Sequence, residues 1–564
     1  VIAPWNYPVN LSLIPLATAI AAGNHVLLKP SEHTPRTSAF LQELLAAVFP
    51  PERVGVVQGG ADVAAAFAAV LARLPVYRTY LPVGLAMLEG ALADAAEAEP
   101  GLADVLGDLR PELTDPDSPV ARRFQQTSGM VMAKGVEDRS FYRYTRWANL
   151  NEVGGDPSHV ALSLADFHAA QQARQAAWPT AMTTLSTHDT KRGEDVRARI
   201  AVLAEEPDRW AAELAELRRL HPLGHPDAER LLWESIVGVW PTDGTAPEEE
   251  RILGFLQKAS REAALATTWT DQDPEFEARL AALAAAVTSP EGPARGVLQA
   301  VADRIAEPGL VVQLGHKLVQ LAAPGVPDVY QGTEVPFPTL VDPDNRRPVD
   351  FAARADLLDR LDAGHTPGLD DPAAAKLAVV AGVLRARRDR PELFTGHRPL
   401  DVSGPAAEHA IAFDRGGALA VATRWPVRLA AAGGWGETVV TVPAGRWEDA
   451  VTGHPVHPDA RGAVRLDELL RLHEHAARAA AGVIDAALVG LQHLDHGAHD
   501  RAGGVELAAA LALAAGELAD AVFVDAAEDV PGAELPQHGP FEGAEPRHTP
   551  EPRPAVPAPL RNPR

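Results

Sequence analysis

Short apolar runs alternate with longer amphipathic ones over the first sixty residues, and this rhythm predicts a mixed α/β segment. The short runs are rich in Val, Ile and Leu, whereas the longer runs repeat apolar residues at helical spacing. Pro35 stands where a helix can begin, because the first helical turn needs no N–H from that position. The expected strands are 1–3, 25–29 and 53–58, and the expected helices are 11–22 and 37–49.

From Ala66 onward the pattern changes to long helices, interrupted by a run of alternating and β-branched character at Met182–Ser186. Residues over about 195–300 are mostly helical in pattern, which suits an inserted helical subdomain. Its helices are expected at 210–220, 228–239 and 248–264. A further helix at 371–390 is followed by short β-branched runs with Gly and Pro turns, which predict strands at 410–413, 420–424 and 438–442.

The last 94 residues differ in composition from the rest. Residues 471–530 are Ala-rich with a helical pattern, and residues 531–564 are Pro-rich, which favours disorder. The helical stretch carries histidines at His-x-His and His-x2-His spacing (His473, His475, His493, His496 and His499). Such spacings occur in metal sites, but a solvated helix face is the more economical interpretation without an acidic or Cys partner set.

Composition narrows the classes of partner. The formal net charge is −25, which repels nucleic-acid phosphates and anionic lipid but leaves neutral ligands such as sugars unaffected. No apolar run reaches the roughly 20 residues of a membrane helix, since the run at 11–22 is short and contains Pro15. The chain opens on Val1 without a basic signal-peptide region, so we expect a cytoplasmic fragment of a larger whole. The chain has no cysteine, which excludes disulfides and thiolate chemistry.

Two motifs in the first segment are specific when taken together. These motifs are Ile2-Ala-Pro-Trp-Asn-Tyr-Pro8 and Lys29-Pro-Ser-Glu32. At this spacing they resemble the cofactor-binding domain of aldehyde dehydrogenases. The resemblance implies a Rossmann-like βαβ fragment over residues 1–65. It also implies that Asn6 would help form an oxyanion hole, and that Lys29 and Glu32 would hold the adenosine ribose of NAD(P).

The same segment stops short of a complete site. The next Gly-rich strand turn, the general-base Glu and the Cys nucleophile of that family do not follow, and a thiohemiacetal cannot form in a chain without Cys. A fragment of this size also leaves half a nucleotide crevice and an unpaired strand edge. We therefore expect no dehydrogenase activity and no tight NAD binding, with these three residues shaping turns as the alternative to a remnant cofactor site.

A second, longer set of motifs occurs in a fixed order. The set is Leu74–Tyr80, Arg123–Gln126, Met132–Asp138, Ser140–Tyr144, Leu150–Pro157, Thr184–Arg192, Pro324–Glu334 and Asp342–Phe351. Together these motifs resemble the maltooligosyltrehalose synthases, which are alpha-amylase-superfamily enzymes, over about residues 68–470. The family needs no metal or organic cofactor, and its substrate class is the maltooligosaccharides (α-1,4-glucans).

The resemblance implies a fold that agrees with the pattern of strands and helices. Residues 66–390 would be the last part of a (β/α)8 barrel with the helical insertion, and Met182–Ser186 and Val326–Gln331 would be its seventh and eighth strands. Residues 391–470 would be the small β-sandwich that follows. Polar residues just past the end of a barrel strand line the active site, and His188 and Asp189 hold that position.

In the family, the aspartate that matches Asp189 stabilises the oxocarbenium-like transition state, and the histidine that matches His188 contacts the same sugar. Lys191 and Arg192 would border the acceptor side as substrate-binding residues. The alternative for Asp189 is an N-cap of the helix expected from Glu194. Other residues stay open between a role in the cleft and one in the scaffold: Lys134, Glu137, Asp138, Asp342, Asp344, Arg346, Arg347, Trp233, Trp240 and Trp269.

Retaining glycoside chemistry needs two carboxyl groups about 5 Å apart. In the superfamily these carboxyl groups precede the part matched here, and no Arg-x-Asp strand end or matching Glu stands upstream of Leu74. We therefore expect a fragment of a (1→4)-α-D-glucan 1-α-D-glucosylmutase of trehalose synthesis, inactive alone and fused to foreign ends. The alternatives are a non-catalytic α-glucan-binding protein and an NAD-binding aldehyde dehydrogenase remnant.

Overall fold

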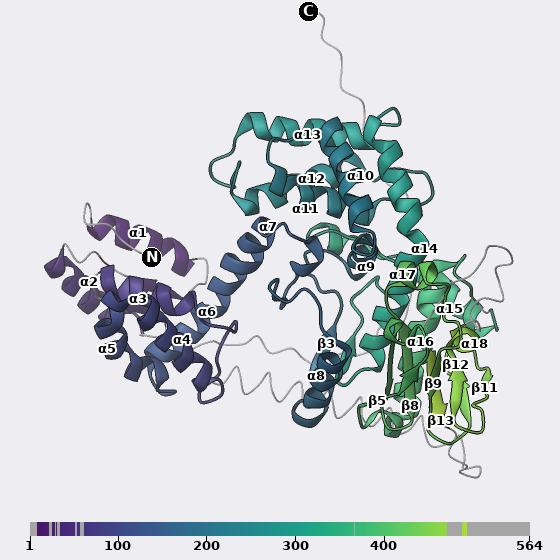
Figure 1. Ribbon diagram of the computed structural model, residues 1–564. Coiled ribbons are helices and arrows are strands. Elements are labelled where there is room, and N and C mark those ends of the chain that lie inside the picture. Colours follow the sequence, from purple (N-terminus) through teal and green to yellow (C-terminus); the bar gives the residue numbers. More distant parts are fainter. Residues whose placement is uncertain are drawn as a thin grey trace, which may run out of the picture. The chain divides into compact units, whose positions relative to one another are not determined.

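The computed structural model describes residues 8–21, 25–28, 30, 34–50, 53–56, 61–365, 367–470 and 488–492. These residues form a mixed α/β structure (Figure 1). None of its helices is both long and apolar enough to cross a lipid bilayer.

The N-terminal segment confirms the alternating pattern read from the sequence. It contains helices α1 (Pro8–Ala21) and α2 (Pro35–Val48) and the parallel strands β1 (Val26–Leu28) and β2 (Val54–Val56). Pro35 occupies the first turn of α2, as expected. Apolar residues of the helices and strands share one small core, so these elements fold against each other. The first expected strand, at 1–3, lies outside the described residues.

Helices dominate the region that follows. Between residues 61 and 177 the helices are α3 (Ala61–Leu71), α4 (Leu85–Ala98), α5 (Ala103–Thr114), α6 (Pro119–Met132), η2 (Ala133–Ser140), α7 (Phe141–Arg143) and α8 (Leu164–Ala177). η2 is a π-helix, in which the hydrogen bonds close wider turns than in an α-helix. It carries three of the charged residues singled out in the sequence.

Two short strands lie side by side although 141 residues separate their ends. β3 (Met182–Thr184) and β4 (Val326–Asp328) pair in parallel, with Met182 opposite Val326. Gly325, just before β4, has a positive φ of 117°, and a Cβ there would meet the Ala181 carbonyl oxygen at 2.7 Å. Only glycine therefore allows the two strands to approach as closely as they do.

The residues between these strands form the helical insertion that the sequence predicts. Its helices are α9 (Glu194–Leu203), α10 (Pro207–Leu220), α11 (Pro226–Val239), α12 (Glu249–Ala263), α13 (Pro274–Thr288) and α14 (Pro293–Ala322). Trp233 and Trp240 are completely buried in their common apolar core, whereas Trp269 is half exposed and stacks under the Arg261 guanidinium. The first two tryptophans therefore stabilise the insertion by burial.

The C-terminal part contains helices α15 (Phe351–Asp362) and α16 (Pro372–Asp389) and two antiparallel sheets, and α16 packs against strands of the larger sheet. The six-stranded sheet has the order β11 (Pro455–Val456), β10 (Trp447–Asp449), β13 (Leu488–Gln492), β8 (Ala418–Thr423), β7 (Ala410–Asp414) and β5 (Arg398–Pro399). The three-stranded sheet has the order β12 (Ala463–Arg465), β9 (Val439–Thr441) and β6 (Val402–Ser403). Apolar residues from both sheets form one core.

Strand β13 corrects the expectation of an unbroken helical segment over 471–530. Leu488–Gln492 pairs with β8 on one side and β10 on the other. The backbone groups of these two strands need partners, and pairing with an apolar run outweighs the helical preference of the Ala-rich surroundings. The remaining residues of 471–530, with their histidines, and residues 531–564 lie outside the described part of the chain.

Candidate functional site

The loop after β3 presents His188 and Asp189, and one amide side chain fixes its course. Nδ2 of the buried Asn345 donates to the carbonyl oxygens of Thr187, His188 and Thr190 at 3.3, 3.1 and 3.4 Å. His188 is exposed and Asp189 is half exposed. Both residues follow the carboxyl end of β3, as the sequence predicts.

Asp189 is not a helix cap. Helix α9 begins after Gly193, which has no side chain to accept a hydrogen bond from the first turn. Gly193 is instead packed against the segment before Asp342: its N–H donates to the Thr339 carbonyl at 2.8 Å, and a Cβ would lie 2.5 Å from Thr339 Oγ1. The capping alternative for Asp189 is therefore excluded, and its carboxylate stays available for a ligand.

One buried ammonium organises three carboxylates around this loop. Lys191 Nζ lies 3.0 Å from Asp138 Oδ1, 3.4 Å from Asp189 Oδ1 and 3.8 Å from Glu137 Oε2. Burial lowers the pKa of Lys191, but the neighbouring carboxylates, Asp138 first, more than offset this, and the net shift is upward. Lys191 is therefore charged at neutral pH and holds the Asp189 carboxylate near a fixed positive charge.

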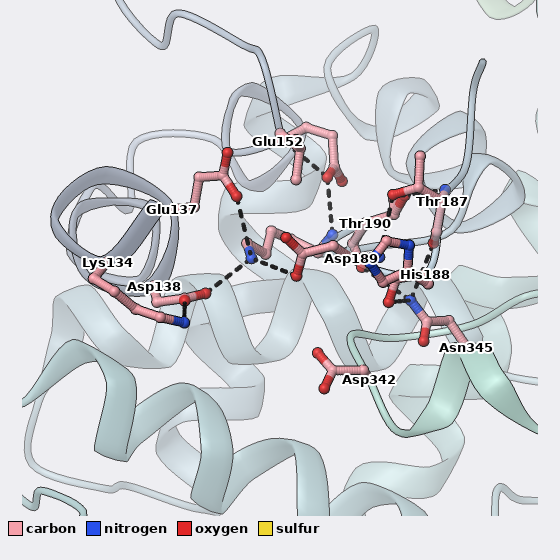
Figure 2. Close-up of polar contacts among 12 residues, drawn as sticks. Lys134, Glu137, Asp138, Glu152, Thr187, His188, Asp189, Thr190, Asp342 and Asn345 are labelled. Carbon is pink, nitrogen blue, oxygen red and sulfur yellow. Dashed lines mark hydrogen bonds and ion pairs between the residues drawn. The ribbon is translucent and has the colours of Figure 1, made fainter. Parts of the chain in front are cut away.

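The π-helix η2 brings its acidic residues to this ammonium. Asp138 bonds both Lys191 and the exposed Lys134, and the pKa of Asp138 is lowered because these bonds outweigh its desolvation (Figure 2). Glu137 is buried and accepts a hydrogen bond from the Tyr77 hydroxyl. These three η2 residues therefore belong to the surroundings of Asp189, a placement that the sequence left open.

Glu152 fixes the loop after β3 as firmly as Asn345 does, although the sequence does not indicate this function. Its two carboxylate oxygens accept hydrogen bonds from the backbone N–H groups of Lys191 at 2.8 Å and Arg192 at 3.1 Å. Glu152 sits inside the Leu150–Pro157 motif, but nothing in that motif says which backbone its carboxylate will meet. Only contacts across about forty residues reveal this function.

The structure places Arg192 differently from the sequence expectation. Its side chain is buried at 1% exposure, and its guanidinium donates to Ser235 Oγ at 2.9 Å and to the Ala148 and Asn151 carbonyl oxygens at 3.3 and 3.4 Å. Arg192 therefore joins the loop to helix α11 and the Ala148–Asn151 turn. Lys191 is likewise buried, with its ammonium 3.4 Å from Asp189 Oδ1.

The loop over residues 342–347 is an ion-paired scaffold. Arg251 forms a two-pronged bond to Asp344 at 2.7 and 2.9 Å, and Lys258 binds Asp342 Oδ1 at 2.6 Å. Arg347 lies 3.2 Å from Asp344, and Arg346 donates to the His188 carbonyl at 3.3 Å. These contacts tie the insertion helix α12 to the loop and hold Asn345 where it meets the His188 backbone.

The three residues expected from the aldehyde dehydrogenase resemblance, Asn6, Lys29 and Glu32, lie outside the described residues. Within the described part of the chain, no group of three or more His, Asp or Glu side chains is arranged to hold a metal ion.

Glu137 gives the site a pH-dependent stability. Burial is the main cause that raises the pKa of Glu137 to about 7, against the opposing effect of Lys191. The folded-state pKa of Glu137 lies above the unfolded value. Glu137 therefore contributes fully to the free energy of unfolding below about pH 4.5, and this contribution is lost as the pH rises through 7. We expect Glu137→Gln to remove this loss, which makes the variant more stable than the parent at pH 8 by about 1–2 kcal/mol after solvent screening.

Urea unfolding of both proteins at pH 5.5 and pH 8 measures this effect. The parent should lose more stability than Glu137→Gln between the two pH values. Glu152→Gln serves as the control, since Glu152 bonds backbone N–H groups and the substitution should weaken the protein at both pH values. An equal pH response in the parent and Glu137→Gln would contradict the assignment.

Two parts of the chain are similar to two different families of known proteins. Residues 1–70 match the model of the aldehyde dehydrogenase family. A probable coniferyl aldehyde dehydrogenase from Pseudomonas aeruginosa is 55% identical over 67 residues, which are 12% of this chain and 14% of the relative.

A longer part, 69% of the chain, is similar to maltooligosyl trehalose synthases. A putative maltooligosyl trehalose synthase from Mycobacterium tuberculosis is 41% identical over 394 residues, which cover 69% of this chain and 50% of the relative. The solved maltooligosyltrehalose synthase from Arthrobacter ramosus is 45% identical with a TM-score of 0.70, over 85% of this chain and 61% of that enzyme. The chain thus spans about half to three fifths of the length of these relatives. Most of it is similar to maltooligosyltrehalose synthases, and its first 70 residues are similar to aldehyde dehydrogenases.

Proposed function

We propose that residues 66–390 are the last part of an alpha-amylase-type (β/α)8 barrel that binds maltooligosaccharides, followed by a β-sandwich over 391–470. The observation that carries this proposal is the Asp189 carboxylate, half exposed at the carboxyl end of β3 and held by Lys191 at 3.4 Å. The adjacent parallel strand β4 and the common core of the two C-terminal sheets support the fold assignment. The similarity to maltooligosyltrehalose synthases supports the substrate class.

An ionised aspartate at this place can perform two tasks. It can accept hydrogen bonds from sugar hydroxyls, and it can stabilise positive charge that develops on a sugar ring in an oxocarbenium-like transition state. The ammonium of Lys191, 3.4 Å from Asp189 Oδ1, holds this carboxylate in place at the end of the strand. The exposed His188 beside it is the second residue that we assign to sugar binding.

The described carboxylates next to Asp189 do not supply a nucleophile and an acid/base pair. Glu152 is bonded to backbone N–H groups, Asp138 to two lysines, and Glu137 is buried against the Tyr77 hydroxyl. None of the three is placed to act on a bond in a bound sugar. We therefore propose that the described chain binds the substrate class but does not by itself convert an α-1,4 into an α,α-1,1 linkage.

We expect Asp189→Asn to weaken maltopentaose binding about tenfold, because a neutral amide replaces a charged acceptor. Its unfolding free energy should change by less than about 1 kcal/mol, since the ion pair to Lys191 is partly exposed. Isothermal titration calorimetry with maltopentaose measures the first effect and urea unfolding the second. The exposed Glu468→Gln is the matched control and should alter neither.

A colorimetric assay of reducing ends on the parent chain completes the test. We expect no loss of reducing ends from maltopentaose above background. Loss that Asp189→Asn abolishes would contradict the proposed inactivity of the chain alone. Equal maltopentaose affinity in the parent and Asp189→Asn would contradict the assignment of Asp189 to sugar binding.

A further inference from the structure

A pocket of about 510 Å³ lies where helices α10 and α11 of the insertion meet the segment after α7. Its lining includes Thr145, Arg146, Leu214, Arg218, Asp227 and Arg230, and we call it the arginine pocket. The chain carries a formal net charge of −25, yet three guanidinium groups line this one pocket. Like charges at close range repel each other, so a ligand that accepts their hydrogen bonds would stabilise the arrangement.

Buried glutamates fix two of the three guanidinium groups. Arg230 Nε lies 2.9 Å from Glu234 Oε1, and Arg218 Nε lies 3.4 Å from Glu229 Oε2. Both glutamates are buried, and Arg218 also donates through Nη2 to the Pro226 carbonyl oxygen. The glutamates thus meet the Nε side of each arginine. Nη1 of both arginines and Nη2 of Arg230 have no hydrogen-bond partner among the described residues.

The segment after α7 supplies further donors. Arg146 is exposed, and its guanidinium forms no hydrogen bond or ion pair with any residue that the structure describes. The Thr145 hydroxyl likewise has no partner in the described part of the chain. Asp227, in the first turn of α11, places a carboxylate in the same lining. Because this carboxylate and the two buried glutamates balance the arginines in charge, recognition here depends on directed N–H donors more than on excess positive charge.

A phosphate group suits this set of donors. Guanidinium groups bind phosphate through two parallel N–H···O bonds, and a phosphate has enough oxygens to accept from several guanidinium groups at once. A phosphate alone is much smaller than the pocket. Ala211 and the buried Leu214, both on α10, form an apolar part of the lining that can receive an organic group.

We propose that the arginine pocket binds a phosphate monoester. The phosphate lies among Arg146, Arg218 and Arg230, and the organic part of the ligand packs against α10. None of the lining residues belongs to the loop after β3, so this site goes beyond the sugar binding proposed for Asp189. The negative net charge of the chain opposes general anion binding, which makes any phosphate that does bind a report on a local site.

Isothermal titration calorimetry of the full chain with phenyl phosphate tests the proposal. The titrations are made at pH 7.5 and constant ionic strength, with inorganic phosphate and phenol as the two partial ligands. We expect one phenyl phosphate per chain, bound about fivefold more tightly than inorganic phosphate because the ring buries apolar area. Phenol lacks the phosphate and should bind at least about tenfold more weakly than phenyl phosphate.

Four variants locate the binding. Arg146→Gln should weaken phenyl phosphate binding about tenfold, and Arg146→Lys about threefold, because lysine keeps the charge but loses the fork of donors. Asp227→Asn should strengthen binding about threefold, since it removes a negative charge from the lining. Arg219→Gln is the matched control: Arg219 lies on α10 next to Arg218, is 67% exposed and pairs with Glu216, and its replacement should leave the affinity unchanged.

Arg146 and Asp227 are both exposed, and far-UV circular dichroism shows whether each variant keeps its helices. No binding of phenyl phosphate, or equal affinity in the parent, Arg146→Gln and Asp227→Asn, would overturn the proposal. Equal affinity for phenyl phosphate and inorganic phosphate would overturn the assignment to a monoester and identify free phosphate as the ligand. Maltopentaose affinity should stay within about twofold in Arg146→Gln, so the result is independent of the sugar binding proposed for Asp189.

Discussion

Replacing Lys376 by methionine is expected to lower the free energy of unfolding by about 3–5 kcal/mol. Lys376 is fully buried, and its ammonium lies 2.5 Å from Asp195 Oδ1 and 2.9 Å from Glu194 Oε1. Burial lowers the pKa of Lys376, but the two carboxylates outweigh it and raise the pKa above its ordinary value, so the side chain is charged. Without this charge, Asp195 loses the ammonium that lies 2.5 Å from it, while Glu194 keeps Lys317 at 2.7 Å.

Urea unfolding followed by tryptophan fluorescence measures the loss. Lys134→Met is the matched control, because its side chain is 80% exposed and should change stability by less than about 1 kcal/mol. Adding Asp195→Asn to Lys376→Met should recover part of the loss, since it removes the buried negative charge that has lost its ammonium and keeps an oxygen for the Phe337 N–H. A loss below about 1 kcal/mol for Lys376→Met would show that the buried pairs do not hold α9 against α16.

Replacing Arg192 by methionine is expected to cost about 2–4 kcal/mol of stability and to leave sugar binding by the folded variant unchanged. The buried guanidinium donates hydrogen bonds to the Ser235 hydroxyl and to two backbone carbonyl groups. Methionine fills a similar volume but has no N–H group to donate. Arg192→Lys should also be destabilising, because one ammonium cannot reproduce the planar fork of donors. The surface variant Arg219→Met, at a side chain 67% exposed, is the control.

The same urea titration and a maltopentaose titration decide between a scaffold and a substrate contact for Arg192. Stability should fall while the affinity of the folded protein stays within about twofold. A variant of unchanged stability whose affinity drops tenfold would restore Arg192 to the substrate-binding residues expected from the sequence.

Local sequence predicted the elements well wherever propensity and burial agree. The helices α10 to α12 were expected within a few residues of their observed ends, because their apolar residues recur at helical spacing around one core. Strand β3 was also expected from its β-branched run followed by polar residues, whereas β4 was expected only from the resemblance to the maltooligosyltrehalose synthases. The pattern failed at β13, where pairing with β8 and β10 overrides an Ala-rich surrounding.

The sequence by itself determined the identity and order of the motifs, the change of character near residue 66, and the placing of His188 and Asp189 just after a strand. Only the tertiary structure decided what surrounds them. Lys191 and Arg192 are adjacent, yet one ammonium meets three carboxylates and the other side chain enters the core of the helical insertion.

The physical reason is that these environments are built from residues far apart along the chain. Glu152 lies 39 residues from Lys191, and Asn345 lies 157 residues from the His188 carbonyl that it binds. Neither contact leaves a periodic or local signal, because each depends on how α9, η2 and the loop after β4 pack together. Short-range patterns thus determine which groups follow the strand, while packing decides which of them remain free to meet a ligand.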